Sequence, residues 1–226
     1  MKAALVYTST TPELIELVEK EVRKNLGEEA ELLSYQDASV LTLTRDAGYV
    51  TKEAAAKLTA MYMQAVLDGA DAILNICSSV GEVADAAQAM AGYIGVPIVR
   101  VDEEMCRDAV RMAMRQNGRI GVLATLSTTL TPTKNTIHRV ARELGVHVTL
   151  VDGLIDAFGA DQDKFKRLMV EKSGEIAADV DVILLCQGSM AYCEELLSET
   201  YHMPVVSSPR YGAVELKKAL QKKGLM

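Results

Sequence analysis

Apolar positions along the chain follow two patterns that alternate and predict strands and helices in turn. Short, nearly continuous apolar runs are typical of parallel strands that are covered on both faces of a sheet. They predict eight strands, near residues 3–7, 31–35, 71–77, 97–101, 119–125, 147–152, 180–186 and 204–208. Apolar residues at helical spacing predict helices at 12–26, 52–68, 104–117, 133–144, 163–178 and 210–223. The alternation predicts an α/β protein with open parallel sheets, and four strands per half predict two doubly wound lobes.

The opening of the chain is repeated halfway along it. Residues 2–7 form an apolar run that is followed by Thr/Ser residues and Pro12, and residues 119–124 are followed in the same way by Thr/Ser residues and Pro132. A threonine precedes both prolines, which is the arrangement of an N-cap hydroxyl before a proline in the first turn of a helix. We therefore expect each half to begin with a strand, a polar loop and a helix.

Composition and charge favour a small-molecule ligand. The 226 residues are 49% apolar and 4% aromatic, which is enough to bury a sizeable core. With 24 basic and 31 acidic residues the net charge is −7, and no basic block is present, so we expect neither a nucleic acid nor a membrane as partner. The first apolar run is short, and no run approaches the roughly twenty residues of a membrane span. We expect a cytoplasmic protein.

Four cysteines are scattered along the chain, at positions 77, 106, 186 and 193. This spacing lacks the density of a disulfide framework, so reduced thiols are expected. There is no CxxC pair, and the three histidines have no ligand spacing to a cysteine, so no metal site is predicted. Cys106 falls inside an amphipathic helix and Cys193 at the start of one, so we interpret both as packing residues.

Cys77 and Cys186 differ from the other two because each ends a predicted strand and leads into small polar residues. In open α/β sheets, ligands bind beyond the carboxyl ends of the strands, so both thiols are expected to face a shared cleft. A helix start beyond each cysteine would stabilise the thiolate, and the backbone amides of 78–81 and 187–190 would cradle a carboxylate. One such cysteine is usually a packing residue, but two at matching positions favour proton transfer to and from opposite faces of a carbon.

The motifs at 6–9, 75–79, 120–125 and 185–189 resemble those of the aspartate/glutamate/hydantoin racemase superfamily. This resemblance implies two pseudosymmetric lobes, residues 1–100 plus 208–226 and residues 101–207, with the active site between them. It also implies a homodimer and catalysis without cofactor or metal. It makes Cys77 and Cys186 the acid/base pair. The substrate contacts that we expect from the resemblance and from the amide cradle are Ser9, Ser78, Ser79, Thr125, Thr128, Gln187 and Gly188.

The chain departs from the better-defined branches of this superfamily. Glutamate racemases carry Asp-Ser after the first strand and histidine after the second cysteine, where this chain has Thr8-Ser9 and Gln187. Aspartate racemases carry Asn-Thr after the first cysteine, where this chain has Ser78-Ser79. Arylmalonate decarboxylases keep only the second cysteine, so Cys77 counts against that activity. The substrate branch is therefore left open.

We expect a cofactor-independent racemase or epimerase that inverts a carbon next to a carboxylate, in an amino acid such as aspartate or in a hydantoin-like compound. One alternative is a maleate-type cis–trans isomerase that uses a covalent cysteine adduct. Another is a two-lobed small-molecule binding protein without catalysis.

The segments 37–51 and 152–163 are expected to be loops that select the substrate. The first contains Arg45, which could pair with a second carboxylate, and the second contains Phe158.

Overall fold

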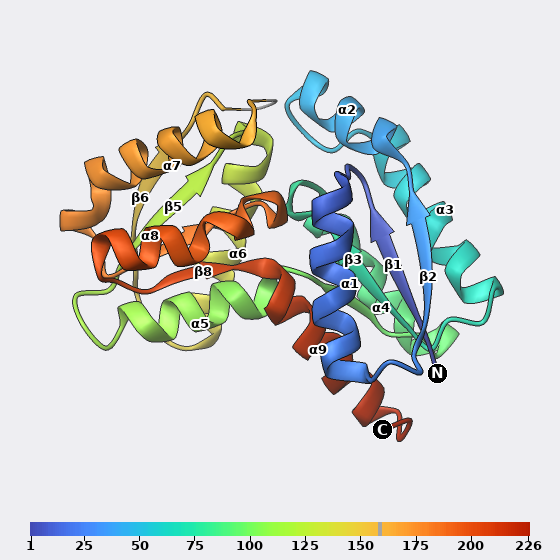
Figure 1. The fold of residues 1–226 in the computed structure, drawn as a ribbon. Helices are drawn as coiled ribbons and strands as arrows, with labels where there is room; N and C mark the ends of the chain where they lie inside the picture. Colours follow the sequence, from blue (N-terminus) through green and yellow to red (C-terminus); the bar gives the residue numbers. More distant parts are fainter. Residues whose placement is uncertain (158–159) are drawn as a thin grey trace. The chain divides into compact units, whose positions relative to one another are not determined.

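The structure is a computed structural model of the chain and describes residues 1–157 and 160–226 (Figure 1). Phe158 of the predicted substrate loop lies outside the described residues. The strands are β1 (Lys2–Tyr7), β2 (Glu31–Gln36), β3 (Ala72–Ile76), β4 (Ile98–Arg100), β5 (Arg119–Ala124), β6 (Thr149–Leu154), β7 (Val182–Leu185) and β8 (Val205–Ser207). The helices are α1 (Pro12–Leu26), α2 (Ala38–Ala47), α3 (Lys52–Leu67), α4 (Gly81–Ile94), α5 (Glu103–Ala113), α6 (Ser127–Glu143), α7 (Gln162–Ile176), α8 (Glu194–Tyr201) and α9 (Ser208–Lys222). Short 3₁₀ helices are η1 (Ser78–Val80), η2 (Ala177–Asp179) and η3 (Gly188–Cys193).

The strands form two parallel sheets with the same topology, β2-β1-β3-β4 and β6-β5-β7-β8. This confirms the predicted α/β class with two doubly wound, four-stranded sheets. The chain divides into two compact units, Met1–Val101 with Pro209–Met226 and Asp102–Ser208. We call them the first and the second unit. Strand order reverses between β1 and β3 in the first sheet and between β5 and β7 in the second, which is where open α/β sheets bind ligands.

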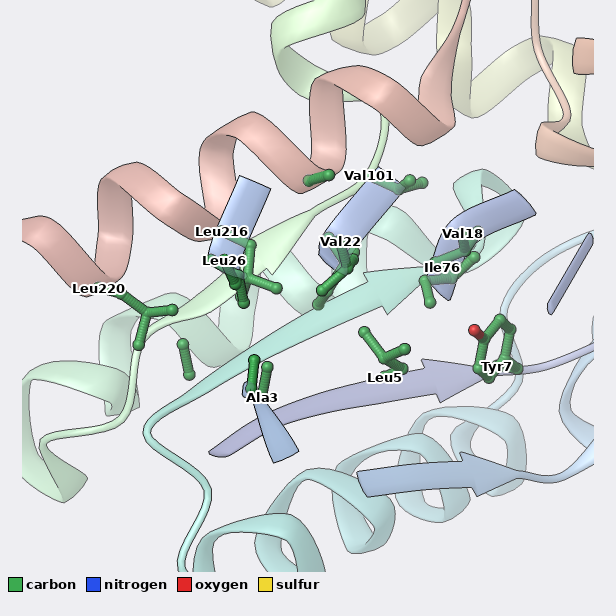
Figure 2. Close-up of a cluster of buried hydrophobic side chains, with 14 of the residues drawn as sticks. Ala3, Leu5, Tyr7, Val18, Val22, Leu26, Ile76, Val101, Leu216 and Leu220 are labelled. Atoms are coloured by element: carbon green, nitrogen blue, oxygen red, sulfur yellow. The ribbon is translucent and has the colours of Figure 1, made fainter. Parts of the chain in front are cut away.

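Side chains of the first sheet alternate between two helical layers, as the period of two in a strand requires. Ala3, Leu5 and Tyr7 of β1 pack on one face with apolar residues of α1 and α9 (Figure 2). Ala4 and Val6 point to the other face, where they pack with residues of α2, α3 and α4. The central strands β1 and β3 are therefore buried on both faces, which explains their apolar sequences.

The second sheet is covered in the same way. Ile183 and Leu185 of β7 pack against α7 and α8, where Met169 and Leu197 are fully buried. The opposite face is covered by α5 and α6, which also contact each other. Of the helices in the described parts of the chain, none is long and apolar enough to span a membrane.

The two prolines that open each half play different parts, and one prediction about them is wrong. Pro12 begins α1, and the Thr11 hydroxyl accepts a hydrogen bond from the Leu14 amide at 3.3 Å, as predicted. Pro132 is instead the sixth residue of α6, which begins at Ser127 rather than 133. The preceding residues are helical because they are buried, with Thr129 2% and Leu130 8% exposed. Burial of this first turn outweighs the backbone hydrogen bond that a proline inside a helix forfeits.

The segment 37–51 is largely a helix, so the prediction of a loop is wrong. Asp37 caps α2 by accepting a hydrogen bond from the Ser39 amide at 2.9 Å, and Gly48 ends it at a φ of 81°. Arg45 therefore belongs to a helix and not to a polar loop. Its guanidinium pairs with the Asp46 carboxylate at 3.0 Å. Polar residues at helical spacing led to the wrong prediction, since only Val40 and Thr44 of α2 are buried.

Candidate functional site

Polar residues follow the two strands that flank the reversal of strand order in each sheet. In the first unit, Thr8 follows β1 and Cys77 follows β3. In the second unit, Thr125 follows β5, and Cys186 and Gln187 follow β7. Carboxyl ends of adjacent parallel strands meet at the same sheet edge, so each unit presents one polar edge that contains a thiol.

The amino ends of the two sheets show how the units correspond. The Lys2 amide donates to the Asp71 carboxylate at 2.7 Å, and the Arg119 amide donates to the Asp181 carboxylate at 2.7 Å. Asp71 and Asp181 are therefore equivalent. Cys77 lies six residues after Asp71, whereas Cys186 lies five residues after Asp181.

Relative to these equivalent aspartates, the positions of the two cysteines therefore differ by one residue. Matching the two cysteine motifs in the sequence did not reveal this difference. Tyr7 pairs with Ile76 and Leu123 with Leu185, so continuing each register sets Thr8 across from Cys77 and Thr125 across from Gln187. Consecutive strand residues point to opposite faces. Cys77 accordingly packs on the α3/α4 side of its sheet. Cys186 is instead hydrogen-bonded to Thr133 of α6, so it lies on the face of the second sheet that α5 and α6 cover, opposite α7 and α8.

Cys77 is held by a buried polar network at the exit of β3. The Tyr62 hydroxyl donates to Asn75 Oδ1 at 2.9 Å, and Asn75 Nδ2 donates to the Cys77 carbonyl at 3.0 Å. Cys77 is partly exposed, whereas the other three cysteines are buried. Ser78 and Ser79 follow in η1 and are almost fully buried. The backbone at Cys77 is therefore fixed from inside, while the residue as a whole remains partly exposed.

Cys186 has a different environment. Its side chain is fully buried, and its amide donates to the Leu123 carbonyl at 2.9 Å. Burial raises the pKa of the Cys186 thiol to about 12; the hydrogen bond with Thr133 opposes this shift, and the charges of Asp102 and Asp152 add to it. The expectation that a helix start stabilises a thiolate here is therefore wrong. Only the short η3 follows Cys186, and desolvation of the charged form dominates.

Thr125 and Gln187 are tied to each other. The Thr125 amide donates to Gln187 Oε1 at 2.7 Å, and Gln187 Nε2 donates to Thr125 Oγ1 at 2.8 Å. These bonds join the carboxyl ends of β5 and β7. Gln187 and Gly188, both predicted substrate contacts, are partly exposed. In this structure the Gln187 side chain links two strands, and a substrate would have to share these hydrogen-bonding groups.

Two threonine hydroxyls at the strand ends are buried and have no hydrogen-bond partner among the described residues. They belong to Thr8, which is fully buried, and to Thr128 in the first turn of α6, which is 7% exposed. An unsatisfied buried hydroxyl costs about 1–3 kcal/mol, so each requires an explanation. Thr128 is a predicted substrate contact. The sequence predicted the neighbouring Ser9, which is exposed, as the substrate contact and missed Thr8. The signal that identifies Thr8 is its position directly after β1, opposite Cys77.

The remaining cysteines lie in packing positions. Cys106 is buried within α5, and Cys193 is buried in the core of the second unit, where burial raises its pKa to about 11. Within the described residues, no group of three or more His, Cys, Asp and Glu side chains is arranged to hold a metal ion. The chemistry offered by the two sheet edges is therefore that of thiols, hydroxyls and backbone amides.

Known proteins resemble this chain in family and in fold. The family model described as Asp/Glu/Hydantoin racemase matches residues 4–216. The chain belongs to this family, which makes it a racemase-type isomerase. None of the curated protein sequences compared matches it significantly.

Solved structures share the fold at low sequence identity. Glutamate racemase isoform RacE1 from Bacillus anthracis superposes with a TM-score of 0.74 at 16% identity, over 99% of this chain and 82% of that one. Glutamate racemase from Thermus thermophilus gives a TM-score of 0.70 at 17% identity, over 100% and 82% of the two chains. Allantoin racemase from Klebsiella pneumoniae gives 0.65 at 17% identity, over 100% and 89%. These likenesses show the fold.

Proposed function

We propose that this protein is a cofactor-independent racemase or epimerase in which Cys77 and Cys186 form an acid/base pair. The substrate is a small molecule whose reacting carbon lies next to a carboxylate or an equivalent carbonyl, such as an amino acid or a hydantoin. The observation that carries the proposal is that each sheet bears a thiol at the carboxyl end of its third strand, beside the reversal of strand order. Membership of the racemase family supports the reaction class.

The proposed reaction moves one proton off the carbon and another onto its opposite face. In one direction, the Cys77 thiolate takes the α-proton, and the electron pair of the broken C–H bond moves into the neighbouring carbonyl. The Cys186 thiol then donates its proton to the other face and is left as a thiolate. The reverse direction exchanges the roles, so no oxidant or cofactor is needed.

The environments of the two thiols suit these resting states. Cys77 is the partly exposed residue of the two and is assigned the role of base, whereas burial raises the pKa of the Cys186 thiol to about 12 and keeps it protonated at neutral pH. A resting pair of one base and one acid is what the forward reaction requires. Because the two groups would be coupled when substrate is bound, they are expected to titrate as a pair in the complex.

The substrate carboxylate and the developing negative charge need hydrogen-bond donors. The unpartnered hydroxyls of Thr8 and Thr128 can supply them, because each is free to donate a hydrogen bond to an acceptor of the substrate. Ser78 and Ser79, together with the backbone amides of η1, extend this set beside Cys77. We further propose, from the resemblance to the family, that the protein acts as a cytoplasmic homodimer with the site between its two units.

Proton NMR in deuterium oxide tests this function directly. The parent protein is incubated with separate enantiomers of aspartate, glutamate, other amino acids, hydantoins and hydroxy acids, and both loss of the α-proton signal and inversion are followed. The parent is expected to exchange and invert at least one class. Cys77→Ala and Cys186→Ala should abolish inversion, and Cys106→Ala serves as the control for loss of a buried thiol.

The same experiment can contradict the proposal. Inversion that survives both single substitutions would rule out the cysteine pair. No exchange with any compound by a folded protein would favour the other readings: a cysteine adduct detected by mass spectrometry with maleate would indicate cis–trans isomerisation, and ligand binding without turnover would indicate a binding protein.

A further inference from the structure

A partly buried ion pair lies on the same side of the first sheet as Cys77. Arg100, the last residue of β4, is 3% exposed, and its Nη1 atom is 2.6 Å from Asp85 Oδ2 of α4. Arg100 pairs in register with Asn75, so their side chains share the face on which Cys77 packs. A buried arginine therefore accompanies the network that holds the exit of β3.

The guanidinium of Arg100 reaches the backbone that follows Cys77. A Cβ atom placed on Gly81 would lie 2.4 Å from Arg100 Nη2 and 2.5 Å from its Cζ atom. Gly81 is the first residue of α4, and only Ser78, Ser79 and Val80 separate it from Cys77. Glycine at position 81 thus permits an approach of the guanidinium that any side chain there would block.

The charges of this region act on one another. Tyr62, fully buried on α3, has a pKa raised above its ordinary value, first by burial and then by the charge of Cys77, with a smaller contribution from Asp85; Arg100 opposes the shift. The thiol, the guanidinium and the carboxylate therefore all lie within electrostatic reach of a single phenol. The charged and titratable groups that act on Tyr62 are thus Cys77, Arg100 and Asp85.

A buried arginine is rarely the most stable choice for a protein interior. Desolvation of the Arg100 charge is costly, its partner Asp85 remains partly exposed, and well-packed apolar residues of similar volume are often as stabilising. An arginine of 3% exposure next to a reactive strand end therefore calls for a role beyond packing. The close approach to Gly81 supplies one, because it couples the cation to the turn that carries Cys77.

We propose that Arg100 is a positioning residue for Cys77: anchored by Asp85 and seated against Gly81, its guanidinium fixes the turn 78–81 and stabilises the thiolate of Cys77 by its charge. The inference rests on the proposed function, in which Cys77 acts as the base. It adds a residue that touches neither substrate nor reacting atoms and acts through the orientation and charge state of the thiol.

The test measures the reactivity of Cys77 without any substrate. The intact protein is treated with iodoacetamide from pH 6 to pH 10, and the modification rate at Cys77 is followed by mass spectrometry; the other three cysteines are buried. Arg100→Met removes the cation and should lower the rate at pH 7 by roughly tenfold, as for a one-unit upward shift of the midpoint. Arg100→Lys should restore part of this loss. Arg23→Met, which removes an arginine bonded to the Glu28 and Ala30 carbonyls, should leave the profile unchanged.

Asp85→Asn separates charge from structure. It keeps the cation and removes its counter-charge, so the midpoint of the Cys77 profile should move to lower pH and the rate at pH 7 should rise about threefold. A merely structural ion pair predicts that Arg100→Met and Asp85→Asn shift the profile in the same direction, and that result would overturn the proposal. An unchanged midpoint in both variants would also overturn it.

If Arg100→Met fails to fold, a second variant tests the proposal. Gly81→Ala displaces the guanidinium without removing any charge and should raise the midpoint of the Cys77 modification profile. Ala86→Gly, at an exposed position on the same helix, is the control and should leave the midpoint unchanged. Failure of the proposed function is distinguishable, because it would appear as absent α-proton exchange in the parent with a normal alkylation profile. Failure of the present inference would appear as unaltered alkylation in variants of an active parent.

Discussion

The two units have the same sheet topology but differ in the hydrogen bonding and burial of the polar groups at their strand ends. In the second unit, Thr125 and Gln187 satisfy each other, and Cys186 is buried against Thr133. In the first unit, the Thr8 hydroxyl has no partner among the described residues, and Cys77 is partly exposed. The side chains at the ends of β5 and β7 therefore satisfy each other, although the Thr128 hydroxyl of α6 has no partner among the described residues. At the end of β1, by contrast, the strand-end hydroxyl of Thr8 itself has hydrogen-bonding capacity that a ligand can use.

A shift of one residue accounts for this difference. Gln187 occupies the register position in the second sheet that Cys77 occupies in the first. The glutamine is long enough to reach back to the end of β5, whereas a cysteine cannot make the same amide bonds. Two halves with one topology can therefore present one accessible and one protected thiol, which a two-base mechanism can use as base and acid.

The largest difference between the units should appear in thiol reactivity. At pH 8, iodoacetamide should modify Cys77 more than roughly 1,000-fold faster than Cys186, because a thiol with a pKa of about 12 is only about 0.01% ionised there and is also buried. Peptide mass spectrometry over a time course measures both rates. Comparable rates would mean that the second edge opens readily in solution, and the contrast between the units would be lost.

The amino ends of the sheets should differ in their contribution to stability. The Asp181 carboxylate accepts hydrogen bonds from the Asn117 amide, Asn117 Nδ2 and the Arg119 amide, whereas the Asp71 carboxylate accepts one from the Lys2 amide. Asp181→Ala should lower the free energy of unfolding by about 3 kcal/mol and Asp71→Ala by about 1 kcal/mol. Urea unfolding of both variants measures this pair, and equal losses would contradict the assignment.

Alkaline pH should weaken the second unit through Cys186. Its pKa is about 12 in the folded protein and about 8.5 in an unfolded chain, so above pH 8.5 the unfolded state binds fewer protons. The free energy of unfolding should then fall with rising pH, by about 1.4 kcal/mol per unit for this thiol. Urea unfolding between pH 8.5 and 10.5 should show a shallower slope for Cys186→Ala than for the parent. Cys193, with a pKa of about 11, contributes in both proteins. Parallel slopes would show that Cys186 is accessible to hydroxide in the folded state.

The smallest effect is also the most diagnostic, because its sign should differ between the units. Thr125→Val removes a hydroxyl bonded to Gln187 and should lower the free energy of unfolding by about 1–2 kcal/mol. Thr8→Val removes an unpartnered buried hydroxyl and should leave stability unchanged or raise it by about 0.5–1 kcal/mol, while it lowers turnover. Thermal unfolding and the exchange assay together measure both. Destabilisation by Thr8→Val would indicate a structural partner for that hydroxyl.

Most of the fold was predictable from the chain itself. All eight strands were predicted, several of them from continuous apolar runs, because central strands buried on both faces tolerate few polar residues. The helix at 38–47 was missed because it buries only Val40 and Thr44, and the start of α6 was placed too late because Pro132 resembles a first-turn proline. The first error arose because local caps at Asp37 and Gly48, rather than an apolar stripe, define the helix, and the second because burial of Thr129 and Leu130 decided the backbone.

The sequence by itself determined the α/β class, the duplicated sheets and the two cysteines at strand ends, since apolar periodicity and chain order are local properties. Only the tertiary structure decided which thiol is protected, because exposure depends on what packs over each strand end. The register of the sheets also places Gln187, rather than Cys186, at the position equivalent to Cys77. The spacing of the cysteines from Asp71 and Asp181 becomes informative only once the structure shows that these aspartates are equivalent. The approach of Arg100 to Gly81 likewise joins residues of two elements whose contact only folding creates.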